Sequence, residues 1–155
     1  MNKLVLSRPA WNDGPQELNI QEAFESIYKI LIDEQITDKK DAYKKTNIYI
    51  MMNEISKYAS STLLGQFDYI NASETAEKLN YIPKDAPNHD RNEWKTIECE
   101  TLILVSKNDP IHPYKYGYLL NEYIPNSKLV EITSKDVSSV QHNIDSNITI
   151  KEFLE

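Results

Sequence analysis

The chain has 155 residues, of which 40% are hydrophobic and 26% charged, and its formal net charge is −7. This length and composition suit a single globular domain with a real core, and the negative charge argues against nucleic acid as a partner, because phosphate binding needs a basic surface. The only glycines, at 14, 65 and 117, exclude glycine-rich phosphate loops, which need clustered glycines.

The first part of the chain predicts one short strand followed by a run of helices. The apolar run Leu4-Val5-Leu6 is typical of a buried strand, which the proline at position 9 closes. Apolar residues at helical spacing then predict a helix over about 20–35, for which Asn19 is a candidate N-cap. Further helices are expected from Thr37 or Asp38 to about 59, around 63–67 and over 74–79, and residues 83–95 are expected to form a polar loop.

The second part of the chain predicts alternating strands and helices. Residues 101–105 read Thr-Leu-Ile-Leu-Val and are apolar on both faces, as in a parallel strand covered by helices on either side. A helix is expected from Pro113 to about 124, a strand over 128–132 and a last helix from about Ser146. This strand–helix–strand–helix order implies parallel strands joined by a right-handed connection.

Together these elements predict an α/β fold, with a three-stranded parallel partial sheet flanked by helices and an inserted all-helical lid. Residues 1–12 and 96–155 are expected to form the sheet part, and residues 13–95 the insertion. Ligands bind beyond the carboxyl ends of the strands in open parallel sheets. That rule selects residues 7–11, 106–110 and 133–142, and it makes Arg8 and Trp11 candidate substrate-binding residues.

The segment from Thr101 to Pro113, TLILVSKNDPIHP, resembles the penultimate strand of α/β-hydrolases and the acid loop that follows it. The helix, turn and strand up to Ile132 continue the likeness, SRPAW at 7–11 is similar to the loop before the family's lid, and STLLGQF at 61–67 resembles a lid helix. The resemblance implies a serine-hydrolase type of enzyme that cleaves an ester or acyl bond in a small molecule. It also implies that Asp109 is the acid of a catalytic triad and His142 its histidine, in the family's chain order of nucleophile, acid and histidine.

One element of the family's pattern has no counterpart in this sequence. The nucleophile elbow, G-x-S-x-G, should precede the first strand, and none of the three glycines flanks a serine in that way. In many members the histidine follows the last strand closely, whereas His142 stands ten residues after Ile132. Two hypotheses follow. The chain is a hydrolase component, inactive alone, whose serine comes from another chain, or it is a non-catalytic remnant or protein-interaction module.

Several candidate residues also have a purely structural interpretation. Asp109 precedes Pro110 and suits a turn. His142 is either the base or an exposed helix residue, and His112 is either a loop packing residue or a direct participant. Cys99 precedes a strand at the sheet's amino end, the wrong end for a site, so we expect it to be inert. The lid tyrosines either line an acyl pocket or pack in the core: Tyr43, Tyr49, Tyr58 and Tyr69.

The remaining expectations concern cofactors, compartment and partners. We expect no cofactor and no metal site, since His89 and Asp90 alone do not make one. The single cysteine allows no internal disulfide, the N-terminal apolar run is too short for a signal peptide, and no apolar stretch is long enough for a membrane helix. A cytoplasmic protein without membrane contact is therefore expected. A partial sheet leaves an edge and an apolar face bare, which predicts self-association or pairing with a separate N-terminal hydrolase half.

Overall fold

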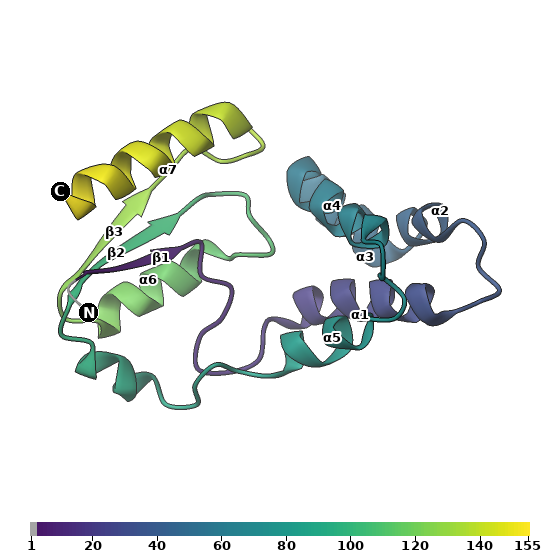
Figure 1. Ribbon diagram of the computed structural model, residues 1–155, viewed down its shortest axis with the longest axis horizontal. Coiled ribbons are helices and arrows are strands. Elements are labelled where there is room, and N and C mark those ends of the chain that lie inside the picture. The colour runs from purple at the N-terminus through teal and green to yellow at the C-terminus, as the bar shows by residue number, and fades with distance from the viewer. Residues whose placement is uncertain (1–2) are drawn as a thin grey trace. The chain divides into compact units, whose positions relative to one another are not determined.

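The computed structural model describes residues 3–155 and divides the chain into two compact units. Unit 1 consists of the chain up to Gly14 together with Pro87–Glu155, and unit 2 of Pro15–Ala86. Figure 1 shows the strands in unit 1 and a group of helices in unit 2. The segment 87–95, which the sequence predicts to be part of the insertion, belongs to unit 1, where Arg91 pairs with Asp13 and Trp94 packs against the core.

Unit 1 contains a three-stranded parallel sheet in the order β1-β2-β3. Leu4 pairs with Thr101 across β1 and β2, and Thr101 pairs with Ser127 across β2 and β3. The predicted α/β class, with a parallel three-stranded sheet flanked by helices, is confirmed. The elements of unit 1 are β1 (Lys3–Ser7), the 3-10 helix η3 (Arg91–Thr96), β2 (Glu100–Val105), α6 (Tyr114–Tyr123), β3 (Ser127–Glu131) and α7 (Ser139–Leu154).

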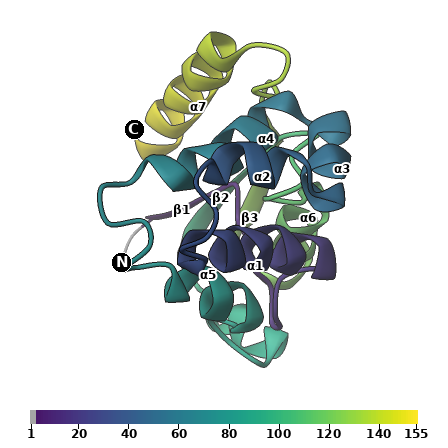
Figure 2. The ribbon, with the colours of Figure 1, turned by 90° about the vertical axis from the view of Figure 1, so that its right-hand side faces the viewer.

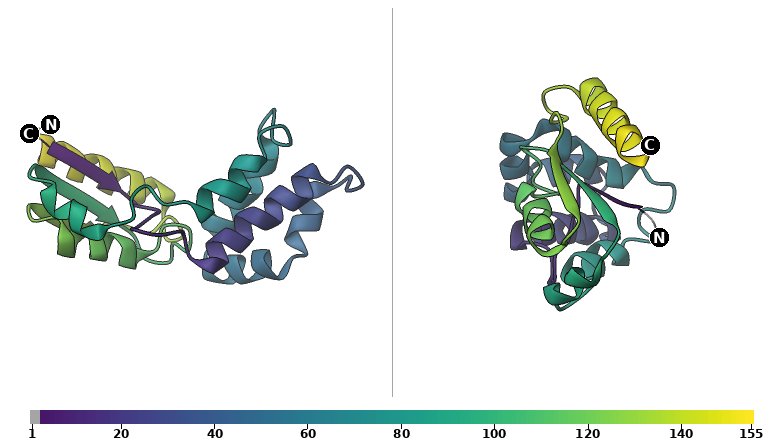
Figure 3. Two further views of the ribbon diagram at one scale, coloured as in Figure 1. Left: turned by 90° about the horizontal axis from the view of Figure 1, so that it is seen from below. Right: turned by 90° about the vertical axis from the view of Figure 1, so that its left-hand side faces the viewer.

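The central strand β2 is buried on both of its faces, from Thr101 to Val105. Ile103 and Val105 join a core cluster with residues of α6, and Leu102 and Leu104 join a second cluster that packs against residues of α7. Each helix therefore covers one face of the sheet, as Figures 1 and 3 show. This arrangement explains the unbroken apolar run of β2, since alternate side chains enter opposite cores.

Helix α6 lies unusually close to the sheet at Gly117. A Cβ atom at this position would stand 2.2 Å from Cγ1 of Val105 and 3.2 Å from Cγ2 of Ile103. Every other residue type would therefore push α6 away from β2. The glycine sets how closely the helix approaches the strand.

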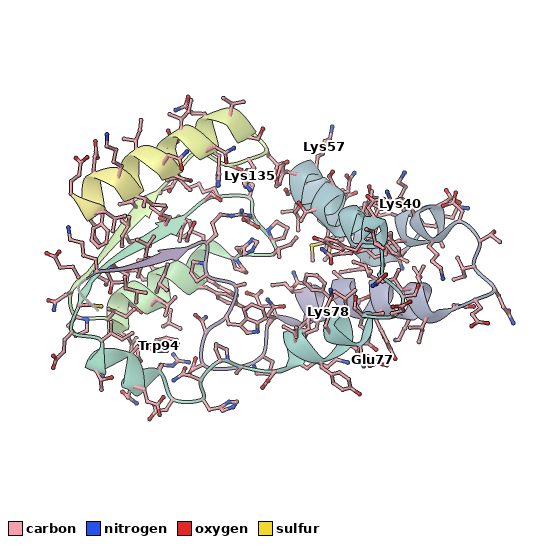
Figure 4. All side chains as sticks on the ribbon, viewed as in Figure 1. Lys40, Lys57, Glu77, Lys78, Trp94 and Lys135 are labelled. Carbon is pink, nitrogen blue, oxygen red and sulfur yellow. The ribbon has the colours of Figure 1, made fainter. Side chains whose placement is uncertain are left out.

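Residues 83–95, predicted to form a polar loop, contain the end of one 3-10 helix, η2 (Ile82–Lys84), and most of another, η3. Asp90 caps η3 by accepting a hydrogen bond from the backbone N–H of Asn92. Trp94 of this segment, labelled in Figure 4, packs against the α6 side of the sheet and meets the ring of Tyr123 edge-on, with ring centroids 6.1 Å apart. Arg91 forms a two-point ion pair with Asp13, through Nε–Oδ2 at 2.7 Å and Nη2–Oδ1 at 3.0 Å.

The last helix begins earlier than predicted. Ser138 caps it by accepting a hydrogen bond from the backbone N–H of Gln141, so α7 starts at Ser139 and not near Ser146. The prediction relied on apolar residues that face the core, and the first two turns of α7 carry exposed ones instead, Val140 and Ile144. The new start places His142 inside the helix.

Unit 2 is built from helices, and Figure 2 shows them in a view turned by 90° from that of Figure 1. The predicted helix over 38–59 is split in three, because Thr46 and Ser56 each cap a new helix by accepting a hydrogen bond from a backbone N–H three residues on. Tyr43 lies fully buried in the core, in contact with the rings of Tyr49 and Phe67. The elements are α1 (Leu18–Ile32), α2 (Lys39–Lys44), α3 (Asn47–Ile55), α4 (Lys57–Leu64), η1 (Gly65–Asp68), α5 (Glu77–Tyr81) and η2 (Ile82–Lys84).

Candidate active site

The carboxyl ends of β1 and β2 carry two residues in the left-handed backbone region. Arg8 follows β1 with φ of 51°, and Asn108 follows β2 with φ of 56°. Residues other than glycine rarely adopt such φ values, and those that do concentrate at functional sites. The backbone N–H of Arg8 donates to the carbonyl of Leu104 at 2.9 Å, which ties the turn after β1 to β2. The two turns therefore bring Arg8 beside Asp109.

Asp109 is the centre of a charged cluster that also contains Arg8 and His112. Arg8 donates to Oδ2 of Asp109 from Nε at 2.8 Å and from Nη2 at 2.5 Å. The other oxygen, Oδ1, accepts from the backbone N–H groups of Ile111 at 3.3 Å and His112 at 3.1 Å. Nδ1 of the His112 ring lies 3.1 Å from Oδ1 and 3.2 Å from Oδ2. Both carboxylate oxygens therefore have partners.

The surroundings keep the Asp109 carboxyl ionised. Its side chain is only 9% exposed, and this burial by itself favours the neutral acid. The hydrogen bond and charge of His112 and the charge and hydrogen bonds of Arg8 outweigh burial and lower the pKa of Asp109 to about 2. At neutral pH the cluster therefore holds a fixed, buried negative charge at the end of the central strand.

His142 lies in α7, whereas the residues of the Asp109 cluster lie in the turns after β1 and β2. Its ring is 4% exposed, and Nδ1 lies 2.7 Å from the carbonyl oxygen of Thr133, so that nitrogen carries the proton and donates it. Burial lowers the pKa of His142, and the hydrogen bond to Thr133 partly offsets this lowering. The interpretation of His142 as an exposed helix residue is wrong. It is a buried imidazole, and the positive charges of Lys135 and Arg8 add to the lowering of its pKa, which the negative charge of Asp109 opposes.

Both backbone polar groups of Thr133 are hydrogen-bonded by side chains of α7. Oδ2 of Asp145 accepts from the N–H of Thr133 at 3.0 Å, while His142 binds the carbonyl of that residue. Hydrogen bonds from Thr133 and Gln141 lower the pKa of Asp145. The loop after β3, which includes the labelled Lys135 of Figure 4, is thereby fastened to the first turns of α7.

Of the residues that the sequence singled out, the structure brings Arg8 and Asp109 into direct contact, although 101 positions separate them. Trp11 is half-buried in the same unit. The sequence leaves a packing role and a direct role open for His112, and its ring is part of the cluster. Its position three residues after an aspartate in a proline-flanked turn was the signal that could have found it.

The described residues form a shallow hollow at each end of the strands. The first, of about 430 Å³, lies beyond β2 and β3 and is lined by residues that include Asn108, Glu131 and Thr133. The second, of about 410 Å³, lies at the amino ends and is lined by residues that include Lys3 and Glu100. Only the first is at the end of the sheet where parallel folds bind ligands.

Solved structures with this arrangement of strands and helices are known. MenH from S. aureus, an α/β-hydrolase, matches 99% of this chain with a TM-score of 0.65 and 20% sequence identity. MGS-M2, an α/β-hydrolase enzyme from a Medee basin deep-sea metagenome library, matches 85% of it with a TM-score of 0.54 and 18% identity. The chain has the α/β-hydrolase fold.

The match is to part of that fold. This chain spans 59% of the MenH chain and 48% of the MGS-M2 chain. No protein-family model and no curated protein matches the sequence. The sequence contains no G-x-S-x-G, the pattern of the nucleophile elbow in α/β-hydrolases.

Within residues 3–155, no group of three or more histidine, cysteine, aspartate or glutamate side chains could hold a metal ion. Over the same residues, none of the helices combines the length and the apolar character that crossing a bilayer demands. Cys99 is a free, half-buried cysteine just before β2.

Proposed function

We propose that this chain is the acid- and histidine-bearing half of an α/β-hydrolase that cleaves an ester or acyl bond in a small molecule. The nucleophilic serine comes from another polypeptide, and the chain alone is inactive. The observation that carries the proposal is the buried, ionised carboxylate of Asp109 at the carboxyl end of the central strand β2. A carboxylate in that position orients an imidazole and stabilises the imidazolium that forms during acyl transfer.

The sheet supports a partner on the β1 side. Among residues 3–155, β1 hydrogen-bonds to β2 alone, so its outer backbone edge has no strand beside it. An unpaired edge is a template for a strand from another chain. The partner in this proposal adds strands there and brings the serine and the oxyanion-stabilising backbone N–H groups with it.

The remaining parts take the roles that the resemblance gives them. Unit 2 is the lid, and Arg8 and Trp11 border the substrate beyond β1. We place the protein in the cytoplasm, in keeping with its single cysteine.

A second candidate function has one observation in its favour. Asp109 is bound by Arg8 and His112, and Nδ1 of His142 is bound by Thr133, so the hydrogen bond that would join Asp109 to His142 in a triad is replaced by others. An arrangement of this kind fits a protein-interaction module that keeps the fold and has lost the reaction.

Labelling with a serine-reactive phosphonate separates the two candidates. The tagged chain is purified without denaturant from cells that produce it, and a fluorescent phosphonate is added, together with a p-nitrophenyl ester assay. We expect a co-purifying polypeptide to be labelled at serine and the chain itself to remain unlabelled. With Asp109→Asn in the chain, the same polypeptide should co-purify and its labelling should slow by about 100-fold or more.

Glu100→Gln, at the opposite end of β2, is the matched control and should leave the labelling rate unchanged. The proposal fails if no serine becomes labelled in the preparation, or if labelling is indifferent to Asp109. Labelling of the purified chain itself would contradict the statement that it is inactive alone.

A further inference from the structure

The chain offers two imidazoles near the carboxyl end of the sheet, His112 and His142, and their surroundings differ. His142 is 4% exposed. The side chain of His112 is 26% exposed and approaches both oxygens of Asp109. A base that takes a proton from a serine on another polypeptide must present a bare nitrogen to that serine.

We propose that His112, and not His142, is the imidazole that works with Asp109, and that Arg8 is the positioning residue for this pair. The inference rests on the proposed function. It departs from the chain order of the family, because His112 follows the acid by three residues, before the last strand, whereas the family's histidine comes after that strand.

The geometry of Asp109 fits a carboxylate that serves His112. Oδ1 is fixed by the backbone N–H groups of Ile111 and His112, so the turn itself places the imidazole on the carboxylate. Oδ2 is fixed by Nε and Nη2 of Arg8. Only small rotations of the Asp109 side chain are compatible with these contacts, and the His112 ring therefore faces an oriented acceptor.

Arg8 also influences which nitrogen of the His112 ring carries the proton. Its Nη2 lies 3.0 Å from Nδ1, and a guanidinium can only donate, whereas Asp109 can only accept from Nδ1 while it is ionised. The two neighbours therefore favour opposite states of that nitrogen. Because Nη2 of Arg8 already has an acceptor in Oδ2 at 2.5 Å, we assign the proton to Nδ1, which donates to Asp109 and leaves Nε2 bare.

The proton balance of the step follows from this assignment. The serine hydroxyl O–H bond breaks as its oxygen attacks the acyl carbon, and the proton forms an N–H bond at Nε2 of His112. Asp109 stays ionised throughout, since its pKa of about 2 prevents it from taking the proton from His112 at neutral pH. The proton on Nε2 then passes to the leaving group as the bond between that group and the acyl carbon breaks, which leaves the acyl group on the serine oxygen.

His142 has a structural task in this scheme. Its Nδ1 holds the carbonyl of Thr133 while Asp145 holds the N–H of the same residue, so His142 fastens the loop after β3 to α7. A glutamine at 142 retains a side-chain donor for that carbonyl, so His142→Gln is the variant that keeps the loop fastened.

Phosphonate labelling of the native complex tests the assignment with one variant for each histidine. We expect His112→Gln to slow labelling by about 100-fold or more, and His142→Gln to slow it less than tenfold once the folded fraction is equalised. His89→Gln, in an exposed loop, is the matched control and should change nothing. If His142→Gln abolishes labelling and His112→Gln leaves it intact, the inference is wrong while the proposed function stands. If Asp109→Asn has no effect, the proposed function itself fails.

Nitrogen-15 NMR of the isolated chain gives a reading that needs no partner. The neutral His112 ring should carry its proton on Nδ1, and Asp109→Asn should perturb the Nδ1 signal of His112 far more than that of His142. A neutral His112 ring protonated on Nε2 in the wild-type chain would overturn the assignment. In Arg8→Gln the carbon-13 signal of the Asp109 carboxyl should titrate at higher pH, with partial recovery in Arg8→Lys, which a residue without influence on the carboxylate would not produce.

Discussion

The two ends of the sheet are built differently. At the amino ends, Lys3 and Glu100 approach each other to 4.0 Å with side chains 28% and 69% exposed, beside an open hollow. At the carboxyl ends, Arg8 and Asp109 meet at 2.5 Å with side chains 17% and 9% exposed. The same pairing of charges is a solvated surface contact at one end and a buried structure at the other. Burial decides which of them matters, because water screens the first pair and not the second.

Asp109→Asn breaks the buried end and should have the largest effect on stability. It leaves the guanidinium of Arg8 buried without its carboxylate, and removing one partner of a buried pair costs about 3 kcal/mol. Urea denaturation at pH 7 measures the loss in the free energy of unfolding. A change below about 0.5 kcal/mol would show that the Arg8–Asp109 pair is as weak as a surface contact.

Lowering the pH tests the contribution of Asp109 to stability without a mutation. The pKa of Asp109 is about 2 in the folded chain and 3.8 ordinarily, so its contribution to stability is complete above pH 3.8 and is lost as the pH falls towards 2. A difference of that size corresponds to about 2 kcal/mol. The free energy of unfolding should therefore fall more steeply over this range in the wild-type chain than in Asp109→Asn. Parallel curves for the two proteins would contradict the lowered pKa.

Gly117→Ala tests the region between the two ends. The added methyl group meets Cγ1 of Val105 in the core and forces α6 away from β2, at a cost of about 1.5 kcal/mol. Thermal unfolding measures the change. Gly65→Ala is the matched control, since no atom lies within 4 Å of its added Cβ, and it should be neutral or slightly stabilising.

Glu100→Gln breaks the exposed end and should have the smallest effect, within about 0.5 kcal/mol in the free energy of unfolding. Raising the salt concentration should erase even that difference. A loss comparable to that of Asp109→Asn would remove the contrast between the two ends of the sheet.

Much of the fold could be predicted from the sequence because local pattern and tertiary structure agree there. The apolar run of β2 is buried on both faces, and Pro113 sets the start of α6. The predicted start of α7 is wrong because the apolar residues of its first two turns face solvent. Only the cap at Ser138 marks where the helix begins. The split of the helix over 38–59 likewise depends on two caps, Thr46 and Ser56, whose role is visible only in their hydrogen bonds.

The candidate site was predictable in place and less so in detail. The rule for parallel sheets selected the turns that hold Arg8 and Asp109. It could not show that these two side chains bind each other, because the contact depends on the left-handed turn at Arg8, which a sequence does not announce. For the same reason the sequence does not predict that the His112 ring contacts Asp109, since this contact depends on the geometry of the turn after Asn108.

Trp94, which packs beside the sheet, has a practical consequence for experiments on the chain. Both tryptophans, Trp11 and Trp94, belong to unit 1, so their fluorescence emission reports on that unit alone. Far-ultraviolet circular dichroism receives most of its signal from helices, which both units contain. Two optical signals that change at different urea concentrations would therefore reveal a chain whose units melt one after the other, and coincident signals a single cooperative transition.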